Sequence, residues 1–279
     1  MDKLGLIAGG GGLPAEIAAH CRRIGRSLYV IRLKGFAGAE LADFDGAEVG
    51  LAELGKCIKL LKREGCDAVC LAGTVSRPDF SALRPDARGL LALPGAVRAA
   101  GQGDDALLRF LVGEFEKEGF RIEGAHEVTG DLSLPAGPLG ACVAGEAHSA
   151  DIARAMAVAR AIGRQDIGQA AVVCRGLVLG VEAQEGTAAL LQRVADLPQA
   201  LRGRAEARAG VLAKAPKPIQ ELRVDMPVIG PQTVAAAAQA GLAGVVGEAG
   251  ALLVLDRAAT IAAADRLGLF ILGVEPDAA

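Results

Sequence analysis

Aromatic and histidine side chains are scarce in this chain of 279 residues. It has no tryptophan, one tyrosine and three histidines, and aromatic residues make up 3% of the sequence. The histidines, at positions 20, 126 and 148, have neither HxxxH nor HExxH spacing, and no serine lies in a GxSxG motif. These absences argue against a histidine-based zinc enzyme and against a Ser/His/Asp hydrolase.

The six cysteines form no CxxC pair and no Cys/His cluster with the spacing of a zinc site. Most lie among apolar residues, which predicts small buried side chains in a reducing cytosol. The N-terminus lacks the longer apolar region of a signal peptide, so we expect a cytoplasmic protein. The net charge of −3 provides no general basic surface, and no nucleic-acid partner is expected.

The first residues have the pattern of a β-α-β unit. An apolar run at 4–8 precedes four glycines, a helical pattern covers 14–24, and a second strand pattern covers 27–33. This succession predicts an α/β protein whose N-terminal domain has a Rossmann-like parallel sheet.

The glycine-rich turn is a candidate phosphate site. Pro14 prevents a full GxGxxG match, and Arg32 and Lys34 lie where an NAD enzyme has an acidic residue. A phosphate bound by backbone N–H groups fits better than NAD. The alternative is a tight turn needed only for packing. The candidate contacts are Gly9, Gly10, Gly11, Gly12 and Leu13.

A buried strand is predicted at 67–72, and Thr74, Ser76 and Arg77 follow it. Ligands of open α/β sheets bind at the carboxyl ends of the strands, so these residues join the predicted site. Asp104 and Asp105 then precede a helical pattern. We interpret Asp104 as its N-cap and Asp105 as a partner of the helix dipole.

The stretch around 128–145 is rich in glycine and proline, and we place the domain boundary there. The predicted organisation is a nucleotide-binding domain at 1–130, a linker at 131–148 and a C-terminal α/β domain of separate fold at 149–279. Apolar runs on either side of Arg175-Gly176 predict a β-hairpin.

Residues 211–233 combine four prolines with a cluster of charged side chains. Because proline fixes φ and removes a donor, we expect a rigid, extended loop. It is either a site for an anionic substrate or an ordinary connecting loop. The uncharged run that follows, 226–247, is long enough to span a bilayer. Its prolines, glutamines and many alanines favour a buried helix and strand instead.

With so few histidines, a hard cation such as Mg²⁺ held by carboxylates is the expected cofactor. Asp225 and Glu221 are the best candidate ligands, followed by Glu185. Lys214 and Lys217 are candidates for neutralising phosphate charge. Gly186 and Thr187 are candidate donors to the same substrate.

Several motifs together resemble the Mg²⁺-dependent UDP-2,3-diacylglucosamine pyrophosphatases of lipid A biosynthesis. They are GLIAGGGGLP, GTVSRPDFSALRPD, GDDALLR, DIGQAAVV, VEAQEGT, KAPKPIQELRVDMPVIGPQT and LFILG, in this order over residues 4–273. The resemblance implies a homodimer in which water attacks the α-phosphorus of UDP-2,3-diacylglucosamine. The products would be UMP and 2,3-diacylglucosamine 1-phosphate (lipid X).

The resemblance also implies residue roles. Asp225 is the aspartate that the family needs for activity. We expect UDP at the glycine turn and at 74–77, further substrate contacts at Gln220 and Thr233, and the uncharged run as the wall of a groove for the acyl chains. Peripheral contact with the inner face of a membrane would bring enzyme and lipid together. The alternatives are a non-catalytic nucleotide-sugar sensor and an NAD(P) enzyme.

Overall fold

The computed structural model describes residues 2–76, 79–130, 132–217, 221 and 223–276. The chain forms two compact units. The first comprises Met1–Asp131 together with Glu221–Asp225, and the second comprises Leu132–Gln220 and Met226–Ala279. A short segment from the C-terminal half of the sequence therefore belongs to the N-terminal unit.

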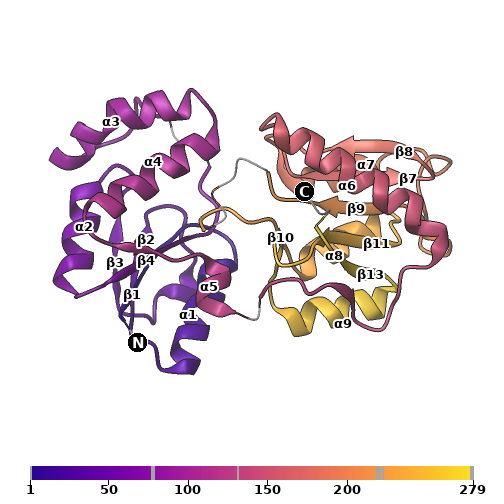
Figure 1. The fold of residues 1–279 in the computed structure, drawn as a ribbon, viewed down its shortest axis with the longest axis horizontal. Helices are drawn as coiled ribbons and strands as arrows, with labels where there is room; N and C mark the ends of the chain where they lie inside the picture. The colour runs from indigo at the N-terminus through magenta and orange to yellow at the C-terminus, as the bar shows by residue number, and fades with distance from the viewer. Residues whose placement is uncertain (1, 77–78, 131, 218–220, 222, 277–279) are drawn as a thin grey trace. The chain divides into compact units, whose positions relative to one another are not determined.

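The first unit contains a parallel sheet in the order β3-β2-β1-β4-β5. Helices α2, α3 and α4 lie on one face, and α1 and α5 on the other (Figure 1). The strands are β1 (Leu4–Ala8), β2 (Leu28–Leu33), β3 (Gly46–Val49), β4 (Ala68–Ala72) and β5 (Arg121–Ile122). The helices are α1 (Leu13–Ile24), α2 (Leu54–Arg63), α3 (Ala87–Ala100), α4 (Asp104–Lys117) and α5 (Ala125–Thr129), with a 3₁₀ turn at Ala39–Leu41. The predicted Rossmann-like arrangement is confirmed.

The second unit contains a mixed sheet in the order β6-β13-β11-β9-β7-β8, beside the short parallel pair β10-β12. The strands are β6 (Gly137–Leu139), β7 (Ala170–Cys174), β8 (Leu177–Val181), β9 (Val211–Lys214), β10 (Val228–Ile229), β11 (Gly244–Glu248), β12 (Leu253–Val254) and β13 (Phe270–Val274). The helices are α6 (Ser149–Arg164), α7 (Gly186–Ala195), α8 (Pro231–Gln239) and α9 (Arg257–Leu267), with a 3₁₀ turn at Glu146–His148.

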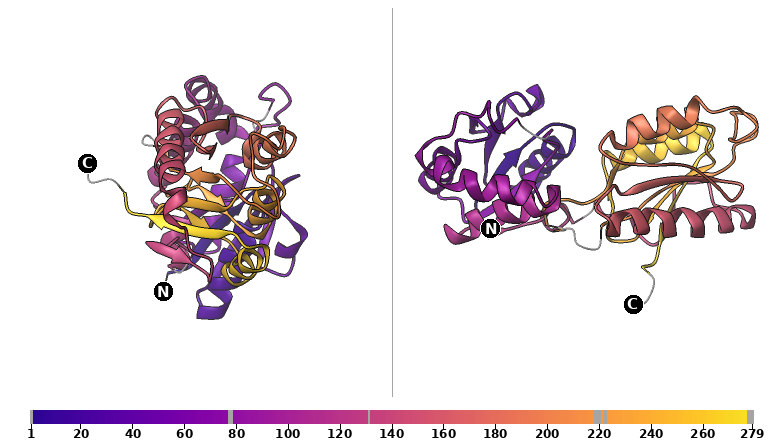
Figure 2. Two further views of the ribbon diagram at one scale, coloured as in Figure 1. Left: turned by 90° about the vertical axis from the view of Figure 1, so that its right-hand side faces the viewer. Right: turned by 90° about the horizontal axis from the view of Figure 1, so that it is seen from above.

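Helices cover both faces of this second sheet, as the alternation along β7 shows. Ala170 and Val172 pack in one core with residues of α7, α8 and α9, whereas Ala171 and Val173 pack in another core with α6. Figure 2 shows α6 on one side of the sheet and α8 and α9 on the other. Successive strand residues point to opposite faces, so a strand buried on both faces is apolar throughout.

The hairpin is confirmed: β7 and β8 pair antiparallel, and Arg175 and Gly176 have φ of 50° and 77°. Positive φ at both turn positions is the geometry of a tight type I′ turn. The stretch predicted as a linker supplies β6, an antiparallel edge strand on β13, and the buried side chains of Leu134 and Leu139. Five of the six cysteines are buried.

The uncharged run at 226–247 forms β10, α8 and β11, and its large apolar side chains lie in the core of the second unit. It is therefore core rather than the wall of an acyl groove, which corrects that prediction. Over the described residues, no helix is long and apolar enough to cross a membrane.

Candidate functional site

A pocket of about 380 Å³ lies in the first unit, at the carboxyl ends of the parallel strands. It extends the core between α2 and α4: Ile7, Leu33, Val49 and Leu71 line it from the sheet. The other lining residues are Gly9, Gly50, Leu51, Glu53, Leu54, Cys57, Ala72, Gly73, Thr74, Val75, Asp104, Leu107, Leu108, Leu111, Phe115, Val224 and Asp225. This is where ligands of open α/β sheets bind.

The glycine turn packs against the end of β4. The Gly9 N–H donates to the Ala72 carbonyl at 2.8 Å, and Gly10 and Thr74 exchange backbone hydrogen bonds of 2.8 and 2.9 Å. A Cβ on Gly9 would approach the Thr74 carbonyl oxygen to 2.8 Å, so only glycine fits there. Close packing thus explains Gly9 and Gly10, whose N–H groups are already bonded.

The rest of the turn leads into α1. Gly12 is the N-cap, Leu13 is the first helical residue, and Gly11 has a φ of 83°. Of the contacts predicted after β4, Thr74 lines the pocket and Ser76 is exposed. Arg77 and Gln220, both predicted substrate contacts, lie outside the described residues.

Asp225 reaches the pocket because α4 binds the short segment that carries it. The Asp105 carboxylate, 2% exposed, accepts from the Glu221 N–H at 2.9 Å and pairs with Arg109 at 2.8 Å. The N–H groups of Val224 and Asp225 then donate to the Glu221 carbonyl at 2.9 and 3.1 Å, forming a turn. A buried carboxylate on α4 therefore fixes the start of the turn that ends at Asp225.

Arg223 provides a second attachment to α4. Its guanidinium donates to both carboxylate oxygens of Glu221 and to Glu116, each at 2.9 Å. Val224 packs against the core of the first unit. These two attachments and the apolar contact hold Asp225 at the pocket.

The same contacts test the predicted metal ligands. The hydrogen bonds from Arg223 lower the pKa of Glu221, and both of its carboxylate oxygens accept from that guanidinium. Glu221 is thus part of the attachment. Two further carboxylates, Asp104 and Glu53, line the same pocket as Asp225. The N-cap of α4 is Gly103, so the prediction that Asp104 caps the helix was wrong.

Within the described parts of the chain, no three His, Cys, Asp or Glu side chains form a group that could hold a metal ion. Mg²⁺ usually takes one or two protein carboxylates together with substrate phosphates and water. Asp104 and Asp225, which both line the pocket, carry ligand atoms of this kind.

The predicted lysines lie in the second unit. Lys214, at the end of β9, is 4% exposed, and its Nζ donates to Thr187 Oγ1 at 2.9 Å and to the Val228 carbonyl at 3.0 Å. Thr187 Oγ1 in turn donates to the buried Glu182 at 2.7 Å. The structure thus brings Lys214 together with Thr187, two residues that the sequence separates by a helix and a long loop.

The other predicted residues of this unit are more dispersed. Lys217 pairs with Asp166 at 2.7 Å, and Glu185 pairs with Arg193. Gly186 begins α7 with a φ of 80°. Thr233 Oγ1 accepts from the Gly230 N–H at the start of α8, which is a capping role.

Sequence reasoning missed the contributions of α4. Asp104, Leu107, Leu108, Leu111 and Phe115 recur at helical spacing on the side facing the pocket. That periodicity is visible in the sequence but is equally typical of a core helix. The bonds of Asp105 to Glu221 and of Arg223 to Glu116 join residues more than a hundred positions apart and carry no local signal.

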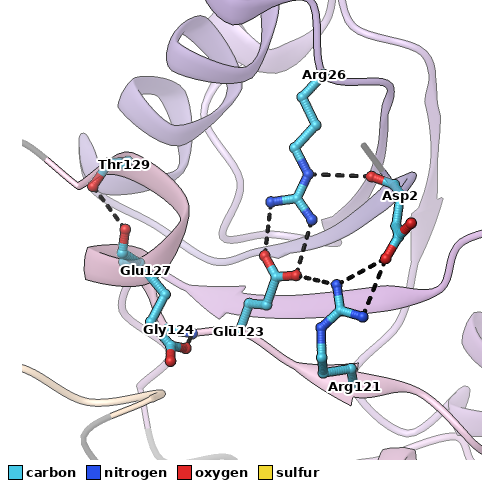
Figure 3. Close-up of polar contacts among 8 residues, drawn as sticks. Asp2, Arg26, Arg121, Glu123, Gly124, Glu127 and Thr129 are labelled. Carbon is cyan, nitrogen blue, oxygen red and sulfur yellow. Dashed lines mark hydrogen bonds and ion pairs between the residues drawn. The ribbon is translucent and has the colours of Figure 1, made fainter.

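A charged cluster occupies the opposite, amino end of the first sheet (Figure 3). Arg26 binds both carboxylate oxygens of Glu123 at 2.7 and 2.9 Å, and Arg121 bridges Glu123 and Asp2 at 2.6 and 3.2 Å. The hydrogen bond from Arg26 lowers the pKa of the Glu123 carboxyl. Here the opposite charges compensate each other.

Comparisons with known proteins cover the whole chain. The LpxI N-terminal domain matches residues 3–132 and the LpxI C-terminal domain matches residues 135–272. The UDP-2,3-diacylglucosamine pyrophosphatase LpxI of Caulobacter vibrioides is 66% identical over 276 residues, covering 99% of both chains. Among solved structures, the CobK precorrin-6A reductase aligns with a TM-score of 0.32 and 15% identity over 100% of this chain and 89% of that one. The two domain matches and the full-length relative establish that the chain belongs to the LpxI family.

Proposed function

We propose that the protein is a UDP-2,3-diacylglucosamine pyrophosphatase in which Asp225 carries the chemistry. The relative of that name matches along its full length. The single structural observation that supports a catalytic Asp225 is its position at the pocket of the first unit, held there by α4 although it lies in the C-terminal half of the sequence.

In the proposed reaction, water attacks the α-phosphorus and the products are UMP and 2,3-diacylglucosamine 1-phosphate. The Asp225 carboxylate orients the attacking water and accepts its proton. Lys214 holds a cationic Nζ at the end of β9 and offsets negative charge on a phosphate oxygen. Lys217 is a second cation for the same purpose, and its pairing with Asp166 fixes its position.

Mg²⁺ suits the acidic side of this site. Asp104 and Asp225 would hold the ion, which when bound neutralises charge on the pyrophosphate. Glu221, a predicted ligand, instead serves to position Asp225 through Arg223.

The test is to incubate the protein with UDP-2,3-diacylglucosamine and Mg²⁺, with and without a chelator, and to measure UMP. In ¹⁸O-labelled water, label in UMP indicates attack at the α-phosphorus, whereas label in the lipid product contradicts it. Binding without UMP release would instead support a nucleotide-sugar sensor. The homodimer and the peripheral membrane contact remain predictions, which sedimentation with and without vesicles would test.

A further inference from the structure

We infer that the outward face of α3 is the surface by which the protein docks on a membrane that contains anionic lipids. The choice of a membrane as the partner rests on the proposed function, because a diacylated substrate resides in a bilayer. The surface itself is identified from the residues of α3, none of which lines the pocket of the first unit.

The large apolar side chains of α3 point away from the core. Leu90, Leu91 and Val97 are 60%, 77% and 47% exposed. Together with the exposed Pro94 they recur every three or four residues, so they lie on one face of the helix. A helix at the surface of a protein usually turns such an apolar stripe toward the core. In α3 the stripe faces solvent instead.

The face of α3 that packs on its neighbours α4 and α2 is built from small residues (Figure 1). A Cβ on Gly89 would approach the Ala52 carbonyl oxygen to 2.0 Å, and a Cβ on Gly95 would approach the Phe110 ring to 2.6 Å. Ala100 is buried as well. The fold thus holds α3 through glycine and alanine and exposes its leucines, which favours a second apolar surface that covers them.

The charge beside the exposed stripe is positive, although the whole chain carries −3. Positions 84–103 contain three arginines and one acidic residue. Arg84 and Arg98 are exposed, whereas Arg88 pairs with Glu114. The acidic residue is Asp86, the N-cap of α3, whose carboxylate accepts from backbone N–H groups. Exposed leucines with arginines beside them are typical of helices that lie in the interface of an anionic bilayer.

A second copy of the chain suits this face less well. A helix of 14 residues is about 21 Å long and about 10 Å wide, so one face covers roughly 200 Å². A stable protein–protein interface takes about 800 Å² from each partner. Pairing two copies through α3 would also bring two positively charged faces together. An anionic bilayer has the opposite charge and offers an apolar interior to the leucines.

The test is binding of the full-length protein to vesicles of phosphatidylcholine and to vesicles of an equal mixture of phosphatidylcholine and phosphatidylglycerol, measured by sedimentation. We expect binding to the anionic vesicles that weakens as salt is added. The double variant Leu90→Ser, Leu91→Ser should lower the partition coefficient by about tenfold or more. Arg98→Ala should lower it by about fivefold, the contribution of one basic residue near an anionic surface.

Two substitutions in the second unit are matched controls. Leu177 on β8 is 53% exposed, and Arg154 on α6 is exposed. Leu177→Ser and Arg154→Ala should leave the partition coefficient unchanged, because both side chains lie outside the proposed surface.

A second readout locates the contact directly. The chain has no tryptophan, so Leu91→Trp adds a single fluorescent reporter. Its emission should shift to shorter wavelength on anionic vesicles, because the indole leaves water. The emission of Leu177→Trp should not shift.

Failure of the docking surface and failure of the proposed function are distinguishable. No vesicle binding by the native protein, or equal binding by the native protein and the α3 variants, would overturn the docking surface. A change in oligomeric state of the leucine variant without lipid would also overturn it, since α3 would then be a subunit contact. UMP release is measured separately on substrate dispersed in detergent, where the α3 variants should match the native enzyme. Absence of UMP release by the native enzyme there would contradict the proposed function alone.

Discussion

The two ends of the first sheet place their charged side chains in different surroundings. At the amino end, Arg26 and Arg121 pair with Glu123 and Asp2, so each charge has a partner within the fold (Figure 3). At the carboxyl end, Asp104 and Asp225 line a mostly aliphatic pocket instead. Ion pairs away from a cavity connect parts of the fold, whereas carboxylates that line a cavity can contact a ligand.

The largest effect should come from the carboxyl end. Asp225→Ala should lower kcat by roughly 10²–10⁴-fold, the usual contribution of a general base. The half-buried position of Asp225 predicts little change in stability, which thermal unfolding would check. UMP release within a few-fold of the native rate would rule out its catalytic role.

Asp104→Asn should have the second largest effect on activity. If Asp104 and Asp225 share a cation, loss of one ligand should raise the Mg²⁺ concentration needed for half-maximal activity by about tenfold or more. Activity should then recover as Mg²⁺ is added. A uniform loss of activity at all Mg²⁺ concentrations would contradict the shared site.

Variants of Asp105 test whether the attachment to α4 positions Asp225 at the pocket. Asp105→Ala removes the acceptor of the Glu221 N–H, so we expect kcat to fall roughly tenfold and the free energy of unfolding to fall by about 1–3 kcal/mol. Asp105→Asn keeps an acceptor and should restore most of kcat.

Glu114 is the control for that comparison, because it is also a buried acid on α4 but pairs with Arg88 and Lys117. Glu114→Gln should lower stability without lowering the kcat of the folded enzyme. An equal kcat for Asp105→Ala and native protein would show that the attachment to α4 does not position Asp225.

The smallest effect on activity is expected at the amino end. Glu123→Gln should lower the free energy of unfolding by about 2 kcal/mol at neutral pH and leave kcat unchanged. Because the folded pKa of Glu123 is lowered by Arg26, this stabilisation is present above the unfolded pKa of about 4.3 and is lost as the pH falls through the folded value. The native and variant unfolding curves should therefore converge in acid, and a difference that persists there would point to packing instead.

Local patterns in the sequence were enough to predict much of the fold. The β-α-β start, the strand at 67–72 and the hairpin at Arg175-Gly176 all depend on residues close together in the chain. The motifs that resemble the pyrophosphatase family were equally visible, and they singled out Asp225. The residue types at a turn and the spacing of apolar residues along a strand or helix are local properties, so they can be recognised in the sequence.

Which side chains meet was decided by long-range packing. The sequence indicated Asp225 as important, but only the tertiary structure assigned the segment 221–225 to the first unit and placed it against α4. The same packing buried the uncharged run in the second unit and left the apolar pocket in the first. A buried core strand and an open apolar wall have the same composition, because what differs between them is only whether another part of the chain covers them.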